Sequence, residues 1–519
     1  MKTINYRYVL RLLGLLLLLM SASMVLAFSW SIFEYFFRVS SWRQGMEIVR
    51  AFLVTMAIGG FVGGGLWFVG STDGHFGKRE ALFLVSVSWL VGAMLAAFPF
   101  YFWAKTHVFI PLQDQAFLSF INCYFEAMSG LTTTGATVLS NVESIPRGLL
   151  FWRAFTHWLG GLGIVVIFVA VLPSLGGGGK KLFHFESTGI ASDTATLNIK
   201  ETTRILLLIY IALTVSQIVL MKLVDPTIGW FSCITESFGT LGTGGYNIYN
   251  ASSGQHSPAV QWVIILFMIL AGINFGLYKK VVRGKLRSAV KDTELRVYLG
   301  IIAGASLIIC AFIYGTDYHE TTGALNNKSL FTAARDAIFQ AVSIQTTTGS
   351  ATANFDQWGL IPKAVLITLM FIGGCGGSTA GGIKVIRIVA ALKIMRVELE
   401  RAFRPSVLRP VRIGTHNVEY HQRISILAYV LGILFLFGVG SVLLMITERA
   451  SGISGTTAMA AAIATLNNVG PGLAGVGPVE NFGWISGAGK LLLSLLMVIG
   501  RLEVFAILVV LMPAFWRSH

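Results

Sequence analysis

Long runs without a charged residue alternate with short polar links along this chain. The first two runs cover residues 12–33 and 51–72, and each is long enough to cross a hydrocarbon core of about 30 Å as a helix. Lys2, Arg7 and Arg11 precede the first run as in a secretory signal peptide, so a cleaved leader is the alternative there. The length of the run favours a retained transmembrane helix.

From residue 78 onward a three-part pattern occurs four times, made of a long apolar run, a shorter apolar segment and a second long run. The first long runs cover residues 81–104, 205–221, 297–316 and 424–447. The short segments cover residues 115–130, 227–238, 329–344 and 452–466. The second long runs cover about residues 148–173, 257–278, 364–383 and 485–516. The short segments are too short to cross the bilayer, which favours half-crossing helices.

This pattern predicts an all-α polytopic membrane protein with ten full spans and four half-spans. Two N-terminal transmembrane helices occupy residues 1–77, and four fused helix, pore loop and helix repeats follow around one pseudo-fourfold pore. The expected boundaries of repeats 1 to 4 are residues 78–200, 201–291, 292–415 and 416–519.

A stretch rich in threonine or glycine follows each short segment. The sequence T-T-T-G ends at Gly135 and occurs again ending at Gly349, and the looser relatives G-T-G and N-V-G end at Gly244 and Gly470. These glycines recur at intervals of about 110 residues, which indicates a duplicated unit. An ordinary turn between helices is the alternative for any one copy, and the fourfold recurrence argues against it.

The composition supports insertion into a membrane. Of 519 residues, 55% are hydrophobic and 12% are charged, against about 25% charged residues in a soluble protein. The formal net charge of +15 is explained by basic cytoplasmic links, so no nucleic-acid partner is expected. Four scattered cysteines with no C-x-x-C pair indicate small core residues and not a disulfide framework.

Basic residues predict the orientation of the chain. The links between the second and third repeats and between the third and fourth are rich in Lys and Arg, at residues 279–296 and 384–412. The loops beside the glycines carry few basic residues, with Arg147 and Lys363 as exceptions. The positive-inside rule therefore predicts a cytoplasmic amino terminus and four glycine stretches at the outer side.

Four outward-facing loops around one axis suit a cation filter. Backbone carbonyls can replace the water shell of an ion, glycine accepts the positive φ needed to turn them inward, and β-branched threonines stiffen an extended backbone. The carboxyl end of each half-helix also favours a cation. The candidate ion-binding residues are Thr133, Thr134, Gly135, Thr243, Gly244, Thr347, Thr348, Gly349, Asn468, Val469 and Gly470.

These motifs resemble the Trk/Ktr/HKT superfamily of potassium transporters, and the two leading helices favour its TrkH-type pore-forming branch. The resemblance covers about residues 78–516. It implies one filter glycine per loop, potassium ions in the filter and no covalently bound cofactor. Glycine at position 135, where sodium-permeable members carry serine, implies potassium selection. The resemblance further implies a homodimer, a cytoplasmic ring of nucleotide-binding regulatory subunits, and the cytoplasmic (inner) membrane of a bacterium.

A glycine-rich segment at residues 373–384 interrupts the second long run of the third repeat. So many glycines, each costing about 1 kcal/mol in a helix relative to alanine, predict an unwound segment, although a small-residue face for helix packing is an alternative. The segment resembles the intramembrane gating loop of the family. Arg501 lies deep in the last span, where a charge indicates function, and a structural salt bridge is its alternative. The candidate gating residues are Gly374, Gly376, Gly377, Gly381, Lys384 and Arg501.

Other charged residues in the spans have simpler explanations. Glu126, Glu236 and Asp336 each lie in a half-helix and are expected to anchor it, through partners such as Arg153. Glu503 is not expected to pair with Arg501, because residues two apart lie on different faces of a helix.

Two other functional classes compete with the pore. A secondary transporter with broken helices would show inverted repeats, whereas each repeat here begins on the same side. A membrane-embedded enzyme would need paired acidic or histidine side chains, and His157 is the main candidate.

Overall fold

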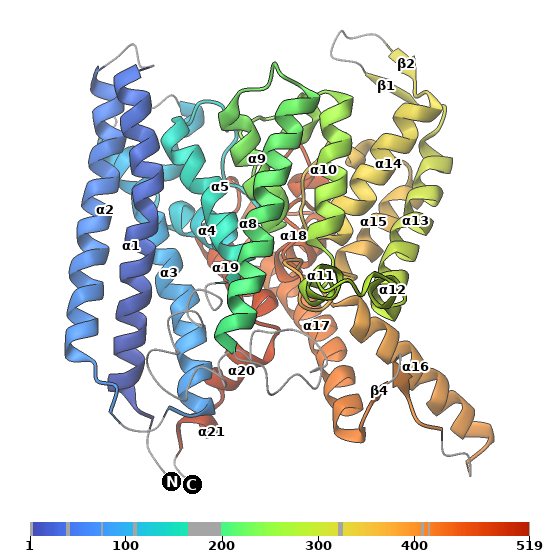
Figure 1. Cartoon of the computed structure of the whole chain (residues 1–519). Helices are drawn as coiled ribbons and strands as arrows, with labels where there is room; N and C mark the ends of the chain where they lie inside the picture. The colour runs from blue at the N-terminus through green and yellow to red at the C-terminus, as the bar shows by residue number, and fades with distance from the viewer. Residues whose placement is uncertain are drawn as a thin grey trace.

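The computed structural model describes residues 4–37, 42–73, 76–106, 112–163, 199–319, 325–405, 409–413 and 416–517. The protein is an all-α polytopic membrane protein, and within these ranges its strands are confined to two short hairpins. The leading helices α1 (Tyr6–Phe37) and α2 (Trp42–Val69) pack along one edge of the molecule, and α13 (Thr293–Ile313) and α14 (Leu330–Gln345) lie at the opposite edge (Figure 1).

Each repeat begins with a long helix that leads to a short one, as the apolar pattern predicts. The long helices are α3 (Lys78–Thr106), α8 (Ile199–Val224), α13 and α17 (Tyr420–Thr447). The short helices, which we call the pore helices, are α4 (Phe120–Leu131), α9 (Trp230–Gly242), α14 and α18 (Gly455–Leu466). Every pore helix ends where its threonine, glycine or asparagine stretch begins, so the predicted half-helices are confirmed.

The second long helices of repeats two, three and four are broken. The glycines at residues 373–384 predict the break in repeat three, whereas the breaks in repeats two and four were not expected. Helix α10 (Pro258–Ala271) turns by 93° into α11 (Phe275–Val282). Helix α15 (Leu360–Phe371) ends before residues 373–384, and α16 (Val385–Phe403) begins after them. In repeat one, α5 (Arg147–Gly161) is the second helix, and the expected continuation over 164–173 lies outside the described residues.

Helix α19 (Gly487–Arg501) is interrupted in a different way before α20 (Phe505–Leu511). Glu503 and Val504 adopt φ values of 54° and 66°, a left-handed conformation that a right-handed helix cannot continue through. Within the described residues six helices are long and apolar enough to cross a membrane, and the bent pair α10 and α11 makes a seventh. Among the described residues, the breaks divide the second helices of three repeats, so the ten spans of the apolar pattern are not all single unbroken helices.

The remaining elements are short. Two antiparallel hairpins pair β1 (Asp317–His319) with β2 (Leu325–Asn327), and β3 (Arg412–Ile413) with β4 (His416–Asn417). Helix α12 (Leu286–Val290) follows α11, and α21 (Pro513–Trp516) follows α20. The 3-10 turns are η1 (Leu112–Leu118), η3 (Ser252–Gln255), η4 (Phe355–Gln357), η5 (Arg449–Ser451) and η6 (Ala474–Val476).

The apolar core includes much of each pore helix. Large side chains such as Trp89, Trp152 and Phe339 are fully buried between the long helices and the pore helices. Three of the four cysteines, Cys123, Cys233 and Cys375, are buried, and all four are free thiols. This packing fixes the direction of each pore helix, so the four loops that follow them meet at the centre.

Candidate ion filter and gate

All four pore helices end in the same backbone motif. One residue adopts the left-handed conformation, with φ of 53° to 55° at Thr133, Thr243, Thr347 and Asn468. The next amide donates to the carbonyl five residues earlier, for example Thr134 N to Ser129 O at 2.8 Å and Gly244 N to Gly239 O at 2.9 Å. This is a Schellman helix end, which usually carries glycine at the left-handed position.

Threonine at this position is strained. A β-branched residue with positive φ is a backbone outlier, and such conformations cost of the order of 1–3 kcal/mol and cluster at functional sites. The sequence-based expectation that these threonines stiffen an extended backbone is therefore wrong for Thr133 and Thr347. The preceding threonines bond to the pore helix through their hydroxyl groups, since Thr132 donates to Met128 O at 2.7 Å and Thr346 donates to Val342 O at 2.8 Å.

The glycine of each loop follows two residues after the strained one. It has a φ of 86° at Gly135, 73° at Gly245, 77° at Gly349 and 98° at Gly470. In the second loop the geometric equivalent is thus Gly245, one residue beyond the Gly244 that the spacing indicates. Gly244 instead corresponds to Thr134, Thr348 and Val469, the residues just before the glycine. Two adjacent glycines made this register ambiguous in the sequence.

The four loops form a closed ring. A Cβ atom on each glycine would overlap a carbonyl oxygen of the next loop, so only glycine fits. The pairs, in order around the ring, are Gly135 with Gly244 O, Gly245 with Thr348 O, Gly349 with Val469 O, and Gly470 with Thr134 O. The last pair joins the fourth repeat to the first, and Asn468 Nδ2 adds a hydrogen bond of 2.9 Å to Thr134 Oγ1.

The ring departs from fourfold symmetry at Gly244. A side chain there would overlap the ring of His157, which is fully buried on α5 and has Nδ1 2.8 Å from Gly130 O. The His157 ring contacts the Tyr246 ring, with centroids 4.1 Å apart and an angle of 34° between the ring planes. It therefore fills the space that the side chains of Thr134, Thr348 and Val469 fill in the other loops, and sequence reasoning assigned it no such role.

Buried ion pairs hold the pore helices, as predicted for Glu126. Its carboxylate lies 2.6 Å from Arg153 Nε and accepts from Val138 N at 2.9 Å. Arg153 in turn donates to Asn247 O of the second loop at 2.9 Å. Asp336 pairs with Lys328 at 2.7 Å. Removing one partner of such a buried pair costs about 3–5 kcal/mol.

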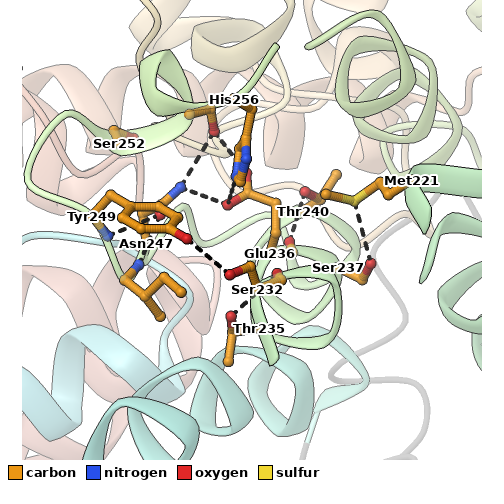
Figure 2. A network of polar contacts seen from close by, with 12 residues as sticks. Met221, Ser232, Thr235, Glu236, Ser237, Thr240, Asn247, Tyr249, Ser252 and His256 are labelled. Atoms are coloured by element: carbon orange, nitrogen blue, oxygen red, sulfur yellow. Dashed lines mark hydrogen bonds and ion pairs between the residues drawn. The ribbon is translucent and has the colours of Figure 1, made fainter. Parts of the chain in front are cut away.

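Glu236 anchors the second loop through a network of polar side chains (Figure 2). It accepts from Asn247 Nδ2 at 2.5 Å and Ser253 Oγ at 2.6 Å, and His256 Nε2 lies 3.5 Å from it. Burial lowers the pKa of His256, but the hydrogen bond and charge of Glu236, with Asp225 further away, raise it more. The net result is a pKa above the ordinary value.

Residues 373–384, the candidate gate, which we call the gate loop, lie against the ring of the four loops. Gly373 N donates to Ile383 O at 3.0 Å and closes the neck of the loop. Gly381 N donates to Thr347 Oγ1 at 2.6 Å, and a Cβ on Gly381 would come within 2.6 Å of Asn467 O. The predicted unwinding is confirmed, so the alternative of a packed helix face is wrong.

Arg501 joins three repeats at this level. Its guanidinium donates to Thr379 O of the gate loop at 2.9 Å and to Gly160 O of α5 at 2.5 Å. Lys384 Nζ donates to Ala380 O within the loop. Glu503 pairs with Arg387 of α16. Gly374, Gly376 and Gly377 form the far part of the loop.

Pore loops of four repeats, joined in one ring inside a multi-pass helical protein, define a transport protein of the membrane. A family model described as "TrkH: Cation transport protein" matches residues 44–518. The chain belongs to this family. It is therefore a transport protein and not a membrane-embedded enzyme, the alternative for which His157 was the candidate residue.

Individual relatives match over nearly the whole chain. The Trk system potassium uptake protein TrkH of Salmonella typhimurium is 34% identical, covering 99% of this chain and 100% of that protein. The protein of the same name from Escherichia coli K12 is 33% identical over the same shares. The crystal structure of the potassium transporter TrkH from Vibrio parahaemolyticus superposes with a TM-score of 0.80 at 31% identity, covering 99% of this chain and 100% of that one.

Proposed function

We propose that this protein carries potassium ions into a bacterial cell through the ring of Gly135, Gly245, Gly349 and Gly470, driven by the membrane potential. The observation that carries the proposal is the closed ring, in which each glycine packs on a carbonyl oxygen of the next loop. Carbonyl oxygens in such a ring replace the water shell of a cation. The relatives named as potassium uptake proteins support potassium as the cation.

The remaining parts of the proposal concern assembly and control. The gate loop and Arg501 obstruct the path on the inner side of the filter, and their movement admits ions. The protein works as a homodimer in the inner membrane with a cytoplasmic amino terminus. A ring of nucleotide-binding regulatory subunits docks on the basic segments 279–296 and 384–412. Potassium ions in the filter are the cargo and not a resident cofactor.

Rubidium uptake into proteoliposomes tests this function. With a potassium gradient and a negative interior, we expect saturable rubidium entry that excess potassium inhibits and excess sodium does not. A secondary transporter with a midplane site would instead require a coupling ion and would show no uptake driven by potential alone. Absence of potential-driven rubidium entry would overturn the proposal.

Gly135→Ser tests the role of the ring in selection. A side chain at a left-handed position costs about 1–2 kcal/mol, and here it also displaces the Gly244 carbonyl. Since about 1.4 kcal/mol is tenfold in an equilibrium constant, we expect the preference for rubidium over sodium to fall about tenfold. Gly452→Ser is the matched control, because Gly452 has a φ of 65° with no neighbour within 4 Å. Equal selectivity in both variants would contradict the filter assignment.

A further inference from the structure

The bend between α10 and α11 is hydrogen-bonded to the gate loop. Cys375 N donates to Gly272 O at 2.9 Å, Phe275 N donates to Gly377 O at 3.0 Å, and Thr379 Oγ1 donates to Ala271 O at 3.2 Å. These bonds join the second repeat to the third, and in each of them the atom on the bend is a backbone atom. A displacement of the bend therefore strains the gate loop directly.

A second attachment comes from Glu294 in the first turn of α13. Its Oε1 atom accepts from Gly376 N at 2.7 Å and from Ile386 N at 3.1 Å. The carboxylate is buried and bridges the far part of the gate loop to the start of α16. The neighbouring Asp292 caps the amino end of α13, where its side chain accepts a hydrogen bond from Glu294 N at 3.0 Å.

The chain between these two attachments is a short exposed segment, residues 276–291, which we call the lever. It contains α12 and most of α11, and Figure 1 shows these two helices side by side and nearly end-on, with α11 below α10. Residues 280–288 are all exposed. Every charged residue of the lever is basic, and these are Lys279, Lys280, Arg283, Lys285, Arg287 and Lys291.

We propose that the lever is the handle through which an acidic protein surface moves the gate loop, and that Glu294 is the positioning residue that transmits the movement. This inference rests on the proposed function. Both ends of the lever are hydrogen-bonded to the gate loop. A partner that shifts the lever therefore displaces the bend at 271–275 and Glu294 at the same time. Unbroken basic charge on an exposed segment selects an acidic partner by complementarity.

The first test compares Glu294→Gln with Asp292→Asn in the full-length protein in proteoliposomes. A neutral amide accepts two backbone N–H groups less strongly than a carboxylate, so we expect passive rubidium flux without any partner to rise about tenfold in Glu294→Gln. Asp292→Asn weakens the cap of the same helix and should leave the flux unchanged. Glu294→Asp keeps the charge on a shorter side chain and should give an intermediate flux.

Thiol labelling gives a readout that a general loss of stability would not produce. Cys375 lies in the gate loop and is fully buried. With Cys123, Cys233 and Cys310 replaced by serine, we expect a maleimide on the cytoplasmic side to label Cys375 about tenfold faster in Glu294→Gln than in Asp292→Asn. Equal labelling and equal flux in these two variants would overturn the role of Glu294.

Soluble polyglutamate probes the lever itself. We expect it to accelerate Cys375 labelling in the otherwise unaltered chain, and not when Lys279, Lys280, Arg283 and Lys285 are changed to glutamine. In Glu294→Gln, labelling is already fast and polyglutamate should add little. Acceleration by anionic lipid vesicles and not by polyglutamate would overturn the acidic protein partner.

The two proposals fail in different ways. If no variant carries rubidium but Glu294→Gln still exposes Cys375, the coupling stands and the transport function fails. If the protein carries rubidium selectively but Glu294→Gln behaves as Asp292→Asn, the transport function stands and the coupling fails.

Discussion

At the residue scale, Gly244 and Gly245 are both confined by close neighbours, but the neighbours differ in kind. A Cβ on Gly245 would overlap the backbone carbonyl of Thr348, which the ring holds in place. A Cβ on Gly244 would overlap the ring of His157, which is a side chain. A backbone obstacle cannot be removed by substitution, whereas a side-chain obstacle can.

This difference predicts which substitutions can be rescued. We expect Gly245→Ala to reduce selective rubidium uptake about tenfold, because a strain of about 1–2 kcal/mol corresponds to about that factor. We expect this reduction whether or not His157→Ala is also present. We expect Gly244→Ala alone to reduce uptake. The double variant Gly244→Ala with His157→Ala should take up as much rubidium as the single variant His157→Ala. Rescue of Gly245→Ala by His157→Ala would contradict the assignment of Gly245 to the ring.

His256 makes stability depend on pH. Burial lowers its pKa, but Glu236 and, more weakly, Asp225 raise it further, so the folded protein holds the proton more tightly than the unfolded chain does. The edge of the Tyr249 ring also faces it. The stabilisation is fully present below the ordinary pKa of 6.5 and is lost as pH rises through the higher folded pKa.

We therefore expect the unfolding temperature in detergent to fall as the pH rises above 6.5, and this fall to be smaller in His256→Gln. His421→Gln is the control, because His421 is exposed beside Glu419. A pH profile that is the same in His256→Gln and in the unaltered protein would refute the role of His256.

Residue roles were predictable from the sequence only where the chemistry was local. Glu126 and Arg153 are opposite charges inside apolar helices, where charged side chains usually form ion pairs, so their ion pair was predictable. Glu294 lies at the end of a basic segment and looks like surface charge, and its contact with the gate loop is 82 residues away in the chain. His157 lies against Gly244 because of tertiary packing that no local pattern encodes.

At the scale of elements, the pore helices were predictable and the helix breaks were not all predictable. A half-length apolar segment between two long ones can adopt few structures in a bilayer other than a half-crossing helix. The glycines of the gate loop also predicted its unwinding. The break after α19 depends on positive φ at Glu503 and Val504, two residues whose side chains give no such signal.

The gate loop can be shortened without moving its ends. Gly373 and Gly382 are adjacent at the neck, where a Cβ on Gly382 would lie 3.1 Å from the Gly373 Cα. Deletion of residues 374–381 should therefore leave α15 and α16 in place and raise partner-independent rubidium flux severalfold, because the contacts with Thr347 and Arg501 are lost. A deletion variant that keeps the normal unfolding temperature but stays closed would count against the gate.

At the scale of the whole molecule, four repeats of one chain supply the four quarters of one ring, and the second quarter differs from the other three. The fourfold plan was predictable because the same apolar pattern recurs. The order of the quarters and the unequal second quarter came from packing between repeats, which a repeat considered alone cannot reveal.

The orientation of the molecule is also testable as a whole. In a chain lacking native cysteines, we expect Ser288→Cys on the lever to react with an impermeant maleimide only from the cytoplasmic side. We expect Glu143→Cys, in the exposed loop after the first filter stretch, to react only from the outer side. The reverse pattern would show that the basic segments face outward, against the positive-inside rule.

The contact of Gly470 and Asn468 with Thr134 has a consequence for biosynthesis. The last pore loop closes the ring, so the first loop lacks its neighbour until synthesis has passed residue 470. At about 5–20 residues per second, the first loop waits on the order of half a minute in the membrane before its partner emerges. A chain that terminates early therefore never completes the ring, and the pore comes into being only when translation is nearly finished.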